Sequence, residues 1–357
     1  MTDTIAAQIE EPLGISPERP TLVERALGLL PLPYGLAAAS VAALLGPPGS
    51  LLVGYIETGS FKTSLLIYFH GYLPEHPWQQ ALAIVLWFAF YTLLFLVIHH
   101  ARRSVSKSRK TLTPLLSKPT DFDEAFRALP RLWPALLIGL AIEAFFIGDY
   151  RMRLAEAPGP VSTIYEALSG PPLYLMSGTA IWVYAGAVGG LRRLGKGPLK
   201  LRPFYEDESM GLKPLATLSL SLSAAYFSLL LIMVLMFLIG PVRVEYVITV
   251  AGLLMLGLVF FFLPLVGAHL RMKEEKKALQ ATIRRRWADL LSRALDPNEP
   301  GEIPDRSTLS VLETLERRVD DARTWPVDLP ILSKLGVMAL TIIVALLTQI
   351  IAKWLGL

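Results

Sequence analysis

Few residues of this chain could do chemistry, and the most unusual of them lies in apolar surroundings. Glu143 is the only acidic residue well inside an apolar run, in the sequence Ala-Ile-Glu-Ala-Phe. An ionised group there costs about 2.5–3.5 kcal/mol to insert into a bilayer, so we expect it to face protein or water rather than lipid. Two interpretations are open: a site for a cation or a proton, and a protonated or hydrogen-bonded contact between helices.

The last apolar run carries small and hydroxyl side chains at helical spacing. They are Thr341, Ala345 and Thr348, with Gln349 beside them. Small residues commonly let membrane helices pack closely, which is the simpler interpretation. The alternative is that these four residues line a pore, because hydroxyl and amide groups suit partly dehydrated ions.

Catalytic and metal-binding motifs are missing from the sequence. The 5 histidines form no HExxH or HxxxH pair, and neither a GxSxG elbow, a phosphate-binding loop nor a dinucleotide-binding fingerprint occurs. The chain has 0 cysteines, which excludes thiolate catalysis and cysteine-bound metals. We therefore expect no enzymatic activity, no metal site and no cofactor.

The sequence contains seven long apolar runs, and the helices that they form must position the residues named above. The runs lie at 26–46, 79–100, 132–148, 172–191, 215–240, 246–268 and 331–355. Each is about as long as the 17–25 helical residues that cross a hydrocarbon core of roughly 30 Å. Hydrophobic residues make up 53% of the chain and the mean hydropathy is +0.48. We predict an all-α, polytopic membrane protein with seven transmembrane helices.

The basic residues predict the orientation of these helices. Of the 34 Lys and Arg residues, five lie on the side expected to be outside, namely Lys62, Arg151, Arg153, Arg243 and Lys353. The others lie in the N-terminal segment, in alternate connections or at the inner end of the last run. Cytoplasmic loops are enriched in Lys and Arg, so we expect a cytoplasmic N-terminus and an outer C-terminus in the cell membrane. The net charge of +4 then reflects loops that face anionic lipid, and we expect no nucleic-acid partner.

We divide the chain into a cytoplasmic segment 1–25, six transmembrane helices with their loops in 26–268, a cytoplasmic helical insertion 269–330 and a seventh transmembrane helix in 331–357. Within the insertion, a coiled-coil-like seam with 3, 4, 3 spacing consists of Leu312, Leu315, Val319 and Ala322. This seam either packs within its own chain or on lipid, or forms a neck that assembles several subunits.

Two short segments and the overall layout resemble known families. Gly211–Leu215 and Trp325–Leu329 look like signatures of uncharacterised prokaryotic multi-pass membrane proteins, a family that implies no activity. The layout is similar to the seven-transmembrane ion-channel superfamily that includes insect chemoreceptors. That resemblance implies a tetramer in which a cytoplasmic helix precedes a seventh, pore-lining helix. The family's Thr-Tyr, five apolar residues, Gln-Phe pattern is altered here, since Ile342 follows Thr341 and the glutamine, at 349, is one position late.

Three functions are compatible with these features. An oligomeric ion channel accounts for the neck and the polar last helix. Such a channel would prefer cations, and gating by an unidentified small-molecule ligand is compatible with it. A secondary transporter would have internal repeats or broken helices with charges at the midplane. A non-conducting scaffold or sensor subunit needs no intramembrane chemistry. In each case the lipid bilayer is a partner; the channel adds ions and further copies of the chain.

Overall fold

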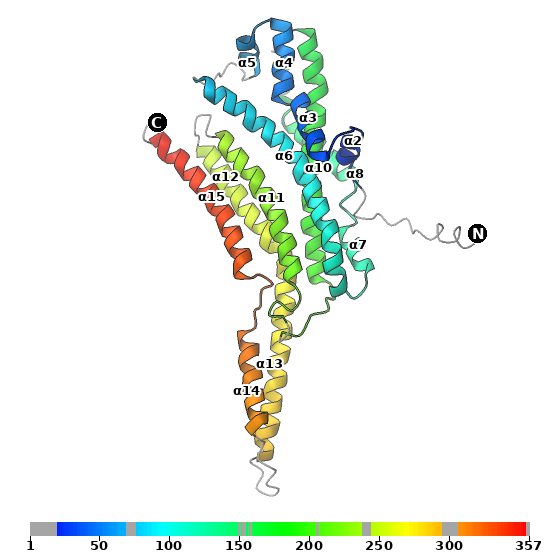
Figure 1. Ribbon diagram of the computed structural model, residues 1–357, viewed down its shortest axis with the longest axis vertical. Coiled ribbons are helices and arrows are strands. Elements are labelled where there is room, and N and C mark those ends of the chain that lie inside the picture. The colour runs from blue at the N-terminus through cyan, green and yellow to red at the C-terminus, as the bar shows by residue number, and fades with distance from the viewer. Residues whose placement is uncertain are drawn as a thin grey trace, which may run out of the picture.

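The structure is a computed structural model that describes residues 20–68, 76–148, 159–204, 207–237, 244–294 and 306–354, together with residues 151, 155 and 157. The described chain is helical and contains one isolated antiparallel bridge, between Leu116 and Leu199. Figure 1 shows an elongated bundle from which α13 (Val266–Ala294) and α14 (Arg306–Asp321) project as a hairpin at one end. The predicted all-α fold is confirmed.

The N-terminal helices differ from the single expected span 26–46. A capping box between Thr21 and Glu24 starts α2 (Leu22–Leu27), which ends before Pro31 and Pro33 instead of continuing into the bundle. The apolar run becomes helical only in α3 (Tyr34–Leu45). After a break at Gly46 it continues as α4 (Pro47–Thr58), where a loop was expected. The short α5 (Phe61–Tyr68) packs against α4.

Three long helices form the centre of the bundle: α6 (Pro77–Leu112), α10 (Pro160–Lys196) and α11 (Lys213–Phe237). The side chains of Ile98, Leu191 and Leu222, one from each helix, are buried in the common core. On one side α7 (Thr120–Phe126) and α8 (Leu132–Phe145) cover α10.

Glycines allow α8 and α10 to approach closely. A Cβ atom added to Gly178 of α10 would lie 2.4 Å from the backbone nitrogen of Gly139 on α8, a distance that no side chain tolerates. Contacts of this kind hold membrane helices together because small residues bring their backbones close enough for extensive van der Waals contact. The α8–α10 pair therefore depends on both glycines.

The C-terminal helices lie on the other side of α11. α12 (Val244–Phe262) passes through a single 3-10 turn, Leu263–Leu265, into α13. After the hairpin, α15 (Leu329–Trp354) returns along the outside of the bundle and packs on α11 and α12 (Figure 1).

Five helical segments of the described chain are long and apolar enough to cross a membrane. They are Tyr34–Thr58, Pro77–Leu115, Lys213–Met236, Val247–Ser292 and Leu329–Thr348. The other two expected spans are less regular. The run 132–148 is the short helix α8, and 172–191 lies within α10, whose first half carries Glu166 and the interior prolines Pro171 and Pro172. The five helices are those of a membrane-embedded protein.

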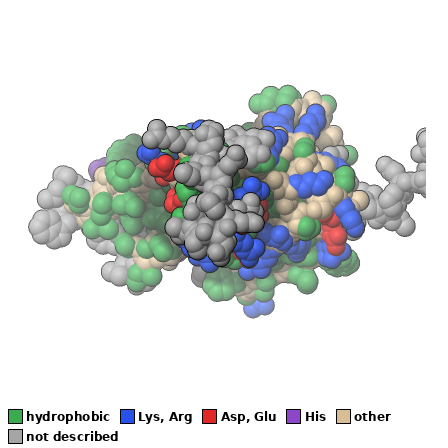
Figure 2. All heavy atoms as spheres, turned by 90° about the horizontal axis from the view of Figure 1, so that it is seen from below, with side chains coloured by type: hydrophobic (Ala, Val, Ile, Leu, Met, Phe, Trp, Pro, Cys, Tyr) green, Lys and Arg blue, Asp and Glu red, His purple; other side chains and the backbone are tan. Residues whose placement is uncertain are grey.

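The basic connections meet at the end of the bundle that carries the hairpin. The Arg193 guanidinium donates to the carbonyl of Ala125, and the Lys200 backbone N–H donates to the carbonyl of Leu115, at 2.9 and 2.7 Å. Figure 2 looks at this end and shows Lys and Arg side chains around the hairpin and over the neighbouring ends of the bundle. This gathering is the spatial counterpart of the charge asymmetry in the sequence.

Candidate functional site

The hydroxyl residues of α15 face away from the rest of the chain. Thr341 and Thr348 are exposed, and each hydroxyl donates to a carbonyl one turn earlier, of Val337 and Val344, at 2.8 Å. Ala345 lies at the edge of the buried face and packs against the core. The structure therefore separates Ala345 from the two threonines, and the side chain of Gln349 lies outside the described residues.

The two threonines belong to a longer exposed stripe on α15. Its members alternate between aliphatic and hydroxyl side chains at 4, 3, 4, 3 spacing, and all are exposed: Val337, Thr341, Val344, Thr348 and Ile351. On the opposite side of the helix, Ile331, Leu335 and Ile342 are buried in the core. The apolar members of the stripe were not predicted from the sequence, although their spacing was visible there.

The start of α15 is fixed by a junction between the segments Gly211–Leu215 and Trp325–Leu329. Asp328, which precedes α15, pairs with Lys213 at the start of α11, with 2.7 Å between Oδ2 and Nζ. Its other oxygen accepts the Ile331 N–H at 3.0 Å, in the manner of a helix cap. The Lys213 ammonium and this N–H hold the pKa of Asp328 below its ordinary value.

Trp325 and His269 complete the junction on the side of α13. Their rings stack with centroids 4.2 Å apart, and His269 Nδ1 lies 2.7 Å from the carbonyl oxygen of Thr324, which requires a proton on Nδ1. On its other side Trp325 meets the edge of Phe262 at the end of α12. The junction therefore ties α11, α12, α13 and α15 together at one point.

The predicted seam on α14 closes the hairpin with its own chain. Leu312, Val319 and Ala322 are buried, and Leu315 is half-buried. The Lys276 ammonium of α13 donates to the carbonyls of Asp320 and Ala322, at 2.6 and 3.0 Å. These residues of α14 pack against α13 of the same chain, as in the interpretation of the seam as a contact within one chain. A contact between subunits would have to use the uncovered side of the hairpin.

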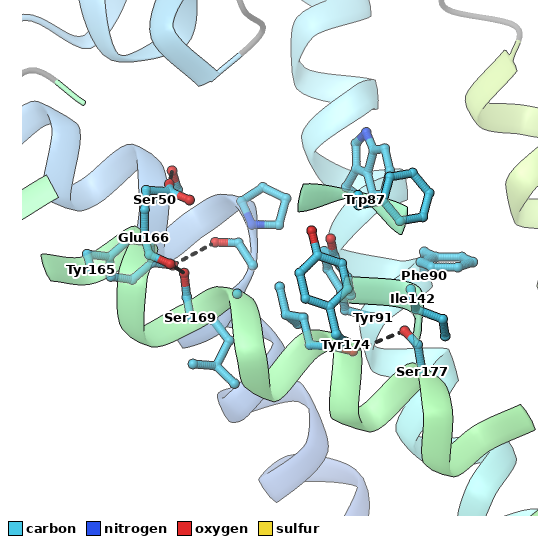
Figure 3. A pocket seen from close by; sticks show the side chains of 16 residues that line it. Ser50, Trp87, Phe90, Tyr91, Ile142, Tyr165, Glu166, Ser169, Tyr174 and Ser177 are labelled. Carbon is cyan, nitrogen blue, oxygen red and sulfur yellow. Dashed lines mark hydrogen bonds between the residues drawn. The ribbon is translucent and has the colours of Figure 1, made fainter. Parts of the chain in front are cut away.

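A cavity of about 320 Å³ lies inside the opposite half of the bundle. Its walls come from the α3–α4 break, α6, α8 and α10 (Figure 3). Six of the 16 lining residues are aromatic: Trp87, Phe90, Tyr91, Phe146, Tyr165 and Tyr174. Cavities that hold small ligands are of this size and combine apolar walls with a few polar groups.

Among the described residues Glu166 is the one charged residue that lines this cavity. The half-buried carboxylate accepts a hydrogen bond from the Ser50 hydroxyl at 3.0 Å. Beside it the Tyr165 hydroxyl lies 2.7 and 3.1 Å from the carbonyl oxygens of Leu44 and Gly46 at the helix break. The Gly46 carbonyl also accepts the Ser50 N–H at 3.2 Å. Backbone groups freed inside a membrane must be satisfied by other protein groups, and here Tyr165 supplies the donor. Aromatic walls with a carboxylate favour an organic cation.

Glu143 does not belong to this cavity. It is half-buried on α8, one turn beyond Gly139, while the neighbouring Ile142 and Phe146 line the cavity. Among the described residues no ion pair joins Glu143 to another side chain.

The cavity is the feature that the sequence did not predict. A weak signal was present in Trp87, Phe90 and Tyr91, whose 3, 1 spacing places three aromatic rings on neighbouring sides of one helix turn. No such signal connects them with Glu166, which is brought to the cavity only by the packing of α10.

Together, these features define an all-helical, membrane-embedded protein with a ligand-sized cavity and an uncovered C-terminal helix. No protein-family description, curated protein or solved structure matches the chain. The groups of His, Asp and Glu in the described residues include none that could hold a metal ion.

Proposed function

We propose that this protein is an oligomeric ion channel that prefers cations, with α15 lining the pore. The observation that carries the proposal is the exposed stripe on α15, where aliphatic and hydroxyl side chains alternate. Around a symmetry axis this stripe would form hydroxyl rings at Thr341 and Thr348, separated by apolar rings. Hydroxyl rings suit partly dehydrated ions, and narrow apolar rings close by dewetting.

The spacing of the stripe also supports assembly. Steps of 4, 3, 4 and 3 residues are those at which neighbouring helices interlock, so this side of α15 can pack against its copies. The similar layout of the seven-transmembrane channel superfamily favours four copies. In this arrangement the chain crosses the membrane seven times, with its N-terminus inside. The additional crossings are α8 and the second half of α10, and the short α8 requires local thinning of the bilayer.

A block of the pore tests the proposal. Thr348→Trp places a large ring on the proposed axis, and we expect it to abolish cation flux into liposomes that contain the purified protein. Ile343→Trp is the matched control, because Ile343 is also exposed on α15 but lies on another side of the helix. Equal flux through both variants, or seventh helices held apart in an image of the oligomer, would refute the pore assignment.

Cation preference is assigned to the carboxylate of Glu143. In the outer half of a bundle a negative charge raises the local concentration of cations. We expect Glu143→Gln to lower the cation-over-anion permeability ratio while total conductance remains measurable. An unchanged ratio would leave the channel intact as a proposal and remove Glu143 from it.

The aromatic cavity is proposed as the site of a gating ligand, an organic cation held by Glu166. Tetramethylammonium is a suitable probe, because ring faces attract quaternary ammonium groups. It should raise the melting temperature of the wild-type protein and shift its open probability, and both effects should be lost in Glu166→Gln. If Glu166→Gln responds like the wild type, the cavity does not bind the probe through its carboxylate.

A secondary transporter is the second candidate, and one observation favours it. The α3–α4 break and the prolines within α10 flank Glu166, so a discontinuous helix and an acidic group meet inside the bundle. Transporters bind their substrates at such places. Single-channel currents would exclude this candidate, whereas accelerated exchange of labelled substrate against internal substrate would support it over the channel.

A further inference from the structure

A second concave site lies at the basic end of the bundle, away from the aromatic cavity. It has a volume of about 790 Å³ and lies between the end of α6, the start of α11 and the segment that joins α10 to α11. Four basic residues line it: Lys107, Lys110, Arg202 and Lys213. Hydroxyl groups complete the lining, from Ser104, Ser108, Thr111, Thr217 and Ser221.

Positive charge exceeds negative charge among the described residues that line this pocket. Among the described residues Asp207 is the only acidic one that lines the pocket, and its oxygens already accept hydrogen bonds from Ser209 and Gly211 at 2.6 to 3.1 Å. Lys213 is shared with Asp328, which lies outside the pocket lining. Lys107 and Lys110 are exposed on the same end of α6. The pocket therefore offers charge and hydrogen-bond donors to an anion.

An apolar groove lies next to the pocket along the same two helices, farther from the hairpin end. The groove, of about 260 Å³, is lined by α6 and α11 residues: Leu93, Leu96, Val97, His100, Ala224, Ala225 and Ser228. His100 marks the boundary, since its Nε2 lies 2.9 Å from the hydroxyl oxygen of Ser221 in the pocket wall. A polar, basic pocket thus adjoins a groove of mostly hydrocarbon character at the His100–Ser221 contact.

We infer that this pocket and groove together bind an anionic phospholipid, with the headgroup phosphate between Lys107, Lys110 and Arg202 and an acyl chain along the groove. Basic pockets between membrane helices bind anionic headgroups by this combination of charge and depth. A soluble phosphate would use the pocket and leave the groove empty, so the groove is what selects a lipid.

The position of the site connects the lipid with α15. Lys213 lines the pocket and also pairs with Asp328, which caps the first turn of α15. A headgroup phosphate therefore lies next to a side chain that fixes the start of that helix. Binding does not depend on the proposed channel activity, and its test uses no flux measurement.

The experiment measures lipid retention by native mass spectrometry on the full chain. Purified protein is exchanged into detergent that contains equal amounts of dioleoyl phosphatidylglycerol and dioleoyl phosphatidylcholine. We expect retained phosphatidylglycerol to exceed phosphatidylcholine by about tenfold or more, and Lys107→Gln combined with Lys110→Gln to remove this preference. Arg103→Gln is the control, because Arg103 is exposed on the same helix and does not line the pocket.

A second variant tests the groove. Ser228→Trp fills the groove from its exposed edge and should reduce retention of phosphatidylglycerol without affecting the lysines. Inorganic phosphate is added in a separate arm. Equal retention of the two lipids, an equal loss in Arg103→Gln, or full displacement by millimolar phosphate with no effect of Ser228→Trp would overturn the inference. The last result would identify a soluble anion as the ligand.

Discussion

The Asp328–Lys213 pair is the contact that joins the start of α15 to α11. Because the folded-state pKa of Asp328 is below its ordinary value of 3.8, its contribution to stability is complete above that value. The contribution is lost as the pH falls through the lower, folded-state pKa, where the carboxylate takes up a proton and the pair with Lys213 is broken. The junction is therefore stable at neutral pH and weakens only in strong acid.

Asp328→Asn tests this charge separately from the helix cap. Asparagine caps a helix about as well as aspartate, so the substitution removes the ion pair and keeps the cap. At neutral pH we expect faster amide hydrogen exchange in the first turn of α15, at Ile331 and Leu332, than in the wild type. In acid below the folded-state pKa the two proteins should exchange alike. A difference that is the same at every pH would assign the effect to something other than the charge.

Glu24 is the second residue on which a local structure depends. Its carboxylate is 3% exposed and lies 2.6 Å from Arg102 Nε and 3.0 Å from His99 Nδ1. It also accepts the Thr21 N–H and hydroxyl of its own capping box. Two elements far apart in sequence, α2 and α6, are thus linked by one acidic group.

Loss of this group should be costly, because its partners remain partly buried. Removing one member of a buried pair costs about 3–5 kcal/mol, and the partial exposure of Arg102 and His99 reduces the expected cost to about 2 kcal/mol. Glu24→Gln should therefore lower the melting temperature measurably, while Glu313→Gln, at an exposed site on α14, should not. If Arg102→Gln costs as much stability in the Glu24→Gln background as in the wild type, the two residues are not coupled.

At the scale of elements, α14 has one face that closes the hairpin and another that is free. Val319 is 1% exposed and Val311 is 56% exposed. The same substitution at these two positions should therefore affect the stability of the hairpin differently. A buried, unpaired carboxylate at Val319→Asp costs several kcal/mol and should open the hairpin. Limited proteolysis within α13 and α14 would measure this opening.

Val311→Asp should leave the hairpin closed and resist the same protease. If the free face of the hairpin joins subunits, this second variant should shift the purified protein to a smaller species in size-exclusion chromatography. Resistance lost equally in both variants would contradict the burial pattern of α14.

At the scale of the whole molecule, the basic residues predict which side each end occupies. A reporter fused after Leu357 should be extracytoplasmic, and one inserted near Pro300 should be cytoplasmic, because 29 of the 34 Lys and Arg residues lie in segments that the sequence predicts to be cytoplasmic. Accessibility of the reporters to a membrane-impermeant label is the measurement. A cytoplasmic C-terminus would require an even number of spans and remove the layout resemblance.

The sequence alone determined the all-helical, membrane-embedded class and the approximate place of most helices. Helices are predicted from local properties of the sequence. These are the hydropathy over a run of residues as long as a bilayer is thick, the prolines at 31 and 33 that break a helix, and the Thr21–Glu24 capping box that starts one. The tertiary structure decided which sides of these helices meet. In a membrane both lipid and protein interior are apolar, so the sequence pattern of α15 does not distinguish its packed face from its free one.

The same reason explains the sites. Glu166 lies beside the aromatic rings of α6, and Lys213 beside Asp328, because helices that are far apart in the sequence pack together. Gly211–Leu215 and Trp325–Leu329 are far apart in the sequence, and only their contact in space shows that they form one junction. Such contacts result from the sum of many weak van der Waals interactions over whole helix faces, which no single motif contains.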